Sequence, residues 1–80
     1  MNVKAEVFTT EDIRALRAKV HKHFNSTTNY AVRWCAEQCA RTAQTWYNWE
    51  IGKTKMSLSQ FNRVLNNVES LLSERRTMAN

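Results

Sequence analysis

Proline, glycine and cysteine are scarce in this 80-residue sequence, which contains none, one and two of them respectively. A single glycine excludes the glycine-rich phosphate loops, because each of them needs several glycines at fixed spacing. Tight hairpin turns also depend on glycine and proline, so a sheet protein is not expected. The sequence therefore predicts an all-α protein whose length accommodates one domain, residues 1–80.

Long apolar runs are missing as well. No run approaches the roughly 18 residues of a membrane-spanning helix, and the polar N-terminal stretch lacks the apolar centre of a secretory signal. We therefore expect a cytoplasmic protein with no membrane partner. Thiols stay reduced in that compartment, so Cys35 and Cys39 are predicted to be free cysteines on one helix face.

Acidic residues are outnumbered. Twelve Lys and Arg against seven Asp and Glu give a net charge of +5, and the excess is spread along the chain. A basic surface favours a polyanionic partner such as nucleic acid.

A first helix is predicted over residues 10–24. Thr9 and Asp12 have the spacing of a capping box. A helical apolar stripe follows, formed by Ile13, Leu16, Val20 and Phe24. Basic residues are expected on the other faces, namely Arg14, Arg17, Lys19 and Lys22.

Two shorter helices are predicted next. The polar residues 25–29 predict a loop that ends in a cap, so the second helix begins near Asn29. Its pattern breaks at residues 40–41. Thr42 then caps a third helix over residues 43–51, in which Trp46 and Trp49 share the apolar side. Gly52 ends that helix in a left-handed conformation. For Trp34, on the second helix, two interpretations stay open: its side chain packs against another helix, or it lies on the surface.

The last helix is predicted over residues 57–75 and is the longest. Its apolar residues repeat at intervals of three and four and define a seam of Leu58, Phe61, Leu65, Val68 and Leu72. Val64 and Leu71 add a second apolar line. Two interpretations stay open for the seam: it joins two copies of the chain as a homodimer, or it closes the core of one.

Three sequence features within residues 32–53 occur at the spacing of a known DNA-binding motif. They are Ala36, the Thr42 cap and the Trp-Glu-Ile-Gly-Lys ending at residues 49–53. Together they resemble the helix-turn-helix of the Cro and phage-repressor (XRE) family. The resemblance implies a compact four- to five-helix, lambda-repressor-like DNA-binding domain, with the helix-turn-helix at about residues 30–52 and a long C-terminal helix.

The turn departs from the family at two positions. Ala40 stands where the family usually has glycine, and a left-handed alanine costs roughly 1 kcal/mol. Arg41 stands where the family has a small apolar residue. Either the stem of Arg41 packs while its guanidinium reaches out, or the turn differs from that of the family.

The resemblance also implies residue roles. Base-reading positions fall on Ala43, Gln44, Tyr47 and Asn48. Amides such as those of Gln44 and Asn48 suit adenine, whereas Ala43 suits only an apolar contact such as a thymine methyl. Phosphate-contacting positions are Arg33, Arg41, Thr42, Lys53, Thr54 and Lys55.

Catalytic and metal chemistry are not expected. His21 and His23 with the two cysteines do not match the spacing of structural zinc sites, so we predict no metal and no cofactor. No residues suggest an oxyanion hole or a substrate cleft, so we predict no enzyme and no small-molecule ligand.

The sequence thus favours a sequence-specific double-stranded-DNA-binding transcriptional regulator. We expect a homodimeric repressor of phage or mobile-element type, a type that includes autoregulatory repressors. It is expected to bind an inverted-repeat operator and to occlude a promoter. The alternative is a helical protein–protein interaction module that keeps the same fold. A third interpretation is single-stranded nucleic-acid binding, because basic and aromatic residues alternate.

Overall fold

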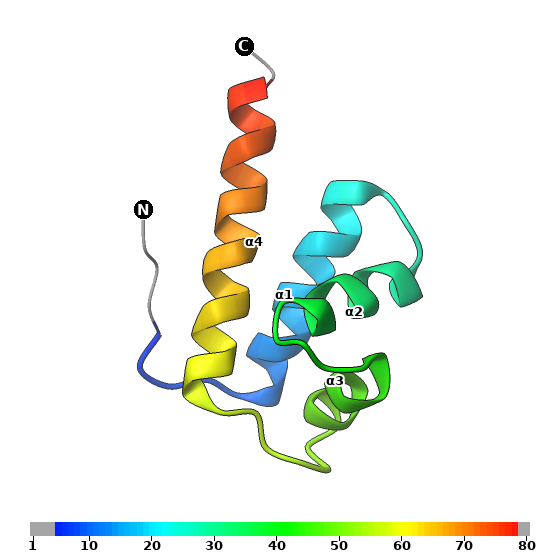
Figure 1. Ribbon diagram of the computed structural model, residues 1–80, viewed down its shortest axis with the longest axis vertical. Helices are drawn as coiled ribbons and strands as arrows, with labels where there is room; N and C mark the ends of the chain where they lie inside the picture. Colours follow the sequence, from blue (N-terminus) through cyan, green and yellow to red (C-terminus); the bar gives the residue numbers. More distant parts are fainter. Residues whose placement is uncertain (1–4, 79–80) are drawn as a thin grey trace.

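The computed structural model describes residues 5–78, with side chains as far as residue 73. Four helices follow one another: α1 (Thr10–Phe24), α2 (Thr28–Glu37), α3 (Ala43–Glu50) and α4 (Leu58–Met78) (Figure 1). No strand occurs in this part of the chain. The prediction of an all-α fold is confirmed.

The start of α1 is fixed by local hydrogen bonds. The Thr9 hydroxyl accepts from the Asp12 amide, and the Asp12 carboxylate accepts from the Thr9 amide at 2.8 Å. This capping box satisfies two amides that a helix start otherwise leaves unpaired. The predicted bounds of residues 10–24 are confirmed.

The apolar stripe of α1 is only partly buried. Ile13, Leu16 and Val20 are buried, but Phe24 is 37% exposed, contrary to the predicted stripe. Phe24 is the last residue of α1, and Asn25 leaves the helix in a left-handed conformation at φ 50°. Because the helix ends at Phe24, this side chain lies at the edge of the fold and not in the core.

The second helix begins earlier than predicted. Thr27, not Asn29, is its cap: the Thr27 hydroxyl accepts from the Tyr30 amide at 3.1 Å. Ala40 then takes up the left-handed conformation, at φ 56°, in the turn that leads to α3. The Arg41 amide donates to the Ala36 carbonyl at 3.0 Å, which closes the end of α2.

Local signals also fix the bounds of α3. The Thr42 hydroxyl accepts from the Thr45 amide at 3.3 Å, as predicted. The helix ends at Glu50, and Gly52 follows at φ +79°, a conformation that L side chains rarely adopt. Trp46 and Trp49 are buried and form an edge-to-face pair.

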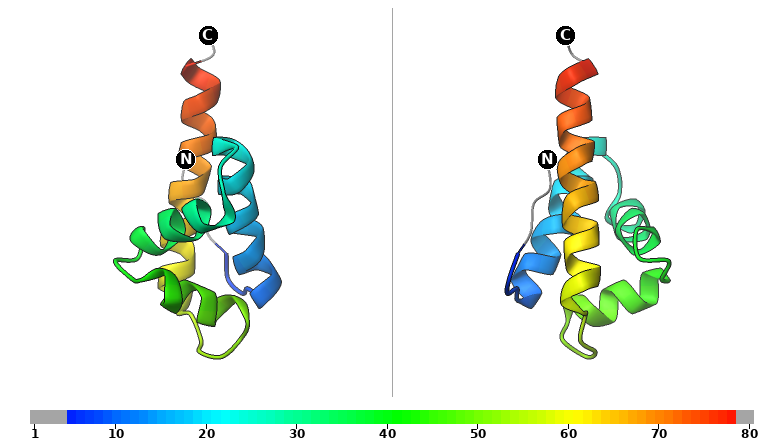
Figure 2. Two further views of the ribbon diagram at one scale, coloured as in Figure 1. Left: turned by 90° about the vertical axis from the view of Figure 1, so that its right-hand side faces the viewer. Right: turned by 60° about the vertical axis from the view of Figure 1, so that its left-hand side comes forward.

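The long helix α4 completes the core. It runs beside α1, and α2 and α3 also pack against α1. The C-terminal end of α4 extends beyond the other helices (Figures 1 and 2). Phe61, Val64 and Val68 are buried against the rest of the chain. No helix of the described chain is long and apolar enough to cross a membrane.

Candidate nucleic-acid interface

Helix α3 has two chemically different sides. Trp46, Trp49 and Glu50 are buried against the other helices. Gln44 and Tyr47 lie on the opposite side and are exposed, Tyr47 by 54%. The remaining two predicted base-reading residues, Ala43 and Asn48, are half-buried at the edges of that side. All four predicted residues thus come from one short helix, and two of them project into solvent.

The two amide side chains on α3 are linked. The Gln44 amide nitrogen donates to the Asn48 side-chain oxygen at 3.0 Å, across one helical turn. Such a bond restricts the rotamers of both side chains. The Gln44 oxygen and the Asn48 nitrogen take no part in this bond, so one acceptor and one donor remain on the two side chains.

A partly buried ion pair joins α3 to α1. Arg17 of α1 donates to both carboxylate oxygens of Glu50, at 3.1 and 3.0 Å, and the Trp46 indole donates to the same carboxylate at 2.6 Å. The hydrogen bond to Glu50 raises the pKa of Arg17 above its usual value. Arg14 adds a bond to the Glu50 backbone carbonyl at 2.7 Å.

Two basic residues of α1 have partners that the sequence did not predict. Arg14 and Arg17 lie off the apolar stripe, as predicted, and both also bind the end of α3. Their partner lies more than 30 residues away in the chain, so helical periodicity contains no signal for it. Glu50 itself, 6% exposed, is the one buried charged residue among the described side chains.

The predicted phosphate-contacting residues lie on both sides of α3 in the chain. All six are exposed: Arg33, Arg41, Thr42, Lys53, Thr54 and Lys55. The loop that follows α3 is held to it, because the Lys53 amide donates to the Asn48 carbonyl at 2.9 Å. Arg41 is exposed rather than packed, in a turn whose left-handed residue is Ala40.

A hollow of about 370 Å³ lies between α2 and α3. Val32 of α2 and Ala43 and Tyr47 of α3 contribute its apolar lining, and the Arg17–Glu50 pair borders it. Further polar lining comes from Thr28, Asn29 and Gln44. Three of the four predicted base-reading residues, Ala43, Gln44 and Tyr47, therefore share one concave surface with the start of α2.

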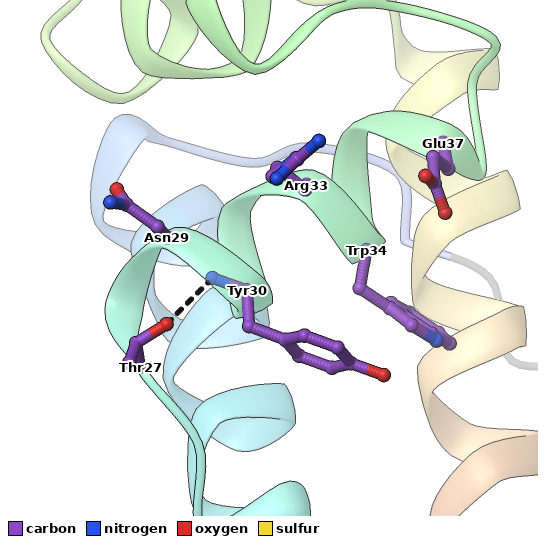
Figure 3. Close-up of a pocket in the computed structure, with 6 residues that line it drawn as sticks. All are labelled: Thr27, Asn29, Tyr30, Arg33, Trp34 and Glu37. Carbon is purple, nitrogen blue, oxygen red and sulfur yellow. Dashed lines mark hydrogen bonds between the residues drawn. The ribbon is translucent and has the colours of Figure 1, made fainter.

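An aromatic cluster occupies a different surface, at the junction of α1 and α2. Phe24 packs edge-on against Tyr30 and lies tilted against Trp34. Tyr30 is 49% exposed, whereas Trp34 is half-buried against the core, which settles its open assignment in favour of packing. Figure 3 shows Tyr30 and Trp34 along a second hollow, which α2 and its cap line together with Arg33 and Glu37. Sequence reasoning missed this cluster.

The cysteines belong to the core. Cys35 and Cys39 are free and buried, and burial raises the pKa of Cys35 to about 12. The pKa of Cys39 is also raised by burial. No group of three or more potential metal ligands occurs in the described part of the chain.

No protein-family model matches this chain, and no curated protein or solved structure is significantly similar to it.

Proposed function

We propose that this chain is a sequence-specific double-stranded-DNA-binding regulator, in which α2 and α3 act as a helix-turn-helix. The observation that carries the proposal is the division of α3 between buried indoles and exposed polar side chains. Trp46 and Trp49 anchor the helix, so Gln44 and Tyr47 project from a fixed support. A major groove accommodates one α-helix, and side-chain amides match the hydrogen-bonding edge of adenine.

The charge distribution supports the same proposal. The exposed Arg41 precedes α3, and the exposed Lys53 and Lys55 follow it. Cations at both ends of a helix in the major groove are placed to neutralise the flanking phosphates. The net charge of +5 adds a general attraction to polyanions.

A homodimer that represses by promoter occlusion completes the proposal. One domain of this size makes few base contacts, and two copies on an inverted repeat double them. Leu58, 38% exposed, and the half-buried Leu65 and Leu72 lie seven residues apart along α4. Leu65 and Leu72 also pack against the core of the same chain, so a second copy would contact mainly Leu58 and the exposed parts of the other two side chains. A regulator of the phage or mobile-element type, with autoregulation, fits this compact form.

Selection from a random duplex pool tests the proposal. The purified chain is incubated with the pool at about 150 mM salt, and the bound fraction is sequenced. We expect enrichment of an inverted repeat with half-sites about one helical turn apart. A flat pool recovered with folded protein would overturn the proposal.

Two substitutions connect the selected operator to the site. Gln44→Ala removes an exposed amide and should reduce the preference for one base pair by roughly 1–3 kcal/mol. Lys53→Ala should weaken binding to all duplexes about equally and lower the salt slope by about one. Lys22→Ala is the charge-matched control, because Lys22 is an exposed residue of α1. An unchanged preference in Gln44→Ala would contradict the assigned base-reading side of α3.

A second candidate function, a protein-interaction module, is favoured by the aromatic cluster of Phe24, Tyr30 and Trp34. Exposed aromatic residues of this kind are enriched at protein interfaces. Salt dependence separates the two functions, because DNA affinity falls with a log–log slope near −0.9 per neutralised phosphate. An aromatic protein interface should respond weakly to salt. Single-stranded binding would instead show little preference among sequences.

A further inference from the structure

We infer that a hollow beneath the loop after α3 binds a small aromatic carboxylate, and that this ligand competes with DNA for Lys55. The ligand site does not depend on the proposed function, whereas its effect on DNA binding rests on that function. We call this site the loop hollow. Its lining includes Phe8, Ile13, Trp49, Thr54, Lys55 and Met56.

The loop hollow has a volume of about 380 Å³ and lies between the start of α1, the end of α3 and the loop at residues 52–56. Ile13, Trp49 and Met56 are all buried and form an apolar floor. The half-buried Phe8 and Trp49 also present rings, and contacts between aromatic rings are more favourable than their area alone predicts. Small-molecule sites have volumes from about 300 Å³ upward, so a two-ring molecule fits the hollow.

The residue that follows α3 keeps the loop hollow open. Gly52 has φ +79°, and a β-carbon at this position would lie 3.8 Å from the Thr10 methyl group. Position 52 therefore carries no side chain into the space between the loop and α1. The sequence predicted no small-molecule ligand, because the segments that line this hollow are distant in the chain and share no common pattern.

One wall of the loop hollow carries a positive charge. Lys55 is exposed, and its flexible stem lets the ammonium reach the mouth of the hollow. Over residues 5–73 the only ion pair joins Arg17 and Glu50, so the ammonium of Lys55 is available to a ligand. The Thr54 hydroxyl is a further donor beside it. An apolar floor with a cation at its rim complements an aromatic ring that carries one carboxylate.

The other two hollows do not offer this combination. The hollow between α2 and α3 is bordered by Arg17 and Glu50, which bind each other. The second hollow, on α2, is lined by both Arg33 and Glu37. An anion that enters either of them meets a carboxylate as well as a guanidinium, whereas the described lining of the loop hollow includes no acidic residue.

Lys55 connects the ligand with DNA binding. It is one of the predicted phosphate-contacting residues, and one ammonium does not neutralise a phosphate and a ligand carboxylate at the same time. The loss of one phosphate contact lowers DNA affinity by about fivefold at about 150 mM salt. Since linkage is reciprocal, DNA should weaken ligand binding by the same factor. The ligand is therefore expected to release the chain from its operator.

Titration of the free chain with naphthoate, a two-ring carboxylate, tests the site without DNA. Heteronuclear NMR follows the indole signals, and we expect a saturable shift at Trp49 with a Kd of about 1 mM or below. The indole signal of Trp34, which lines the second hollow, should stay in place. Naphthamide is the neutral counterpart and should bind about threefold more weakly, because it forms no ion pair with Lys55.

Two matched pairs of variants locate the ligand. Lys55→Gln should abolish the difference between naphthoate and naphthamide, whereas Lys53→Gln, outside the lining, should retain it. Thr10→Leu should fill the hollow and weaken both ligands by about fivefold. Thr28→Leu is its control, because Thr10 and Thr28 each follow the capping threonine of a helix but only Thr10 lines this hollow. The NMR spectrum of each variant establishes that it is folded.

The selected operator then tests the competition. Saturating naphthoate should lower the DNA affinity of the native sequence by about fivefold in fluorescence anisotropy, with sodium chloride added to the reference sample to match the sodium. In Lys55→Gln the ligand should have no such effect. Unchanged DNA affinity at saturating ligand would overturn the competition.

Two results with the free chain would overturn the ligand site. One is a Trp49 signal that does not move up to about 10 mM naphthoate, tenfold above the expected Kd. The other is equal affinity for naphthoate and naphthamide. Neither result affects the proposed function, which the duplex selection tests separately. A chain that binds naphthoate but no specific duplex overturns the proposed function and the competition, while the ligand site stands.

Discussion

The guanidinium of Arg17 and the carboxylate of Glu50 form a two-bond ion pair that joins α1 to the end of α3. Glu50 is 6% exposed, and its carboxylate also accepts from the Trp46 indole at 2.6 Å. Three donors thus satisfy one buried carboxylate, which offsets the cost of removing it from water. The orientation of α3 depends on this arrangement as well as on apolar packing.

Removing one partner of the pair should be costly. Arg17→Met keeps much of the stem but leaves the Glu50 carboxylate buried with the Trp46 indole alone. We expect a loss of about 3 kcal/mol in the free energy of unfolding, measured by urea denaturation. The double variant Arg17→Met/Glu50→Leu should recover part of that loss, because no charge then remains buried.

Lys19→Met is the control for that measurement, since Lys19 is an exposed residue of the same helix. It should change the free energy of unfolding by less than about 0.5 kcal/mol. Equal effects of Arg17→Met and Lys19→Met would show that the ion pair behaves as a solvated surface pair.

The left-handed turn residue Ala40 offers a stabilising substitution. At φ 56° its side chain is strained, and Ala40→Gly removes the strain. Glycine also gains freedom in the unfolded chain, so we expect a net stabilisation of about 0.5–1 kcal/mol. Thermal unfolding measures it, with Ala18→Gly as control: Ala18 is exposed within α1, and glycine there should destabilise by about 1 kcal/mol. Destabilisation by Ala40→Gly would contradict the left-handed conformation.

Ionisation of Cys35 should make the fold sensitive to alkali. Burial raises the pKa of this thiol from its usual 9.0 to about 12, so the folded chain holds the thiol proton more tightly than the unfolded chain. The resulting contribution is complete below pH 9 and is lost as pH rises towards 12. Urea denaturation across this range should show a shallower decline for Cys35→Ala than for the native sequence. Parallel declines would contradict a buried thiol at position 35.

The seam on α4 can be tested at the positions that remain exposed. Leu58→Asp changes a side chain that is 38% exposed, so it should yield folded monomers in sedimentation if the seam joins two copies. Phe61→Ala removes a ring that stacks on Phe8 with centroids 4.3 Å apart and should instead destabilise the fold by about 3 kcal/mol or more. An unchanged dimer in Leu58→Asp would exclude this part of the seam as the interface.

Local sequence signals predicted the helix starts at Thr9 and Thr42 because a cap acts on amides only two or three residues away. The same locality explains the left-handed residues at Ala40 and Gly52. The second cap was placed two residues late because Thr27 and Asn29 are both capping residues, and only the backbone chooses between them.

The sequence did not predict which apolar residues pack against distant parts of the chain. Periodicity placed Phe61 and Val68 on one seam but did not decide between core and partner. In the structure both are buried within the single chain, which favours the core interpretation at these two positions. Phe24 continued the period of α1 although the helix ends there, so it joined Tyr30 at the surface instead. The predicted DNA contacts remain predictions.

In the eight-residue helix α3, the residues that stabilise the fold are different from the residues that face solvent. Trp46, Trp49 and Glu50 contribute the anchoring contacts, while Gln44 and Tyr47 project from the fold. Changes at the two outward positions should therefore leave the melting temperature almost unaltered. A lineage carrying this chain is therefore free to exchange those side chains one at a time, and so to change the chemistry of this surface without passing through unfolded intermediates.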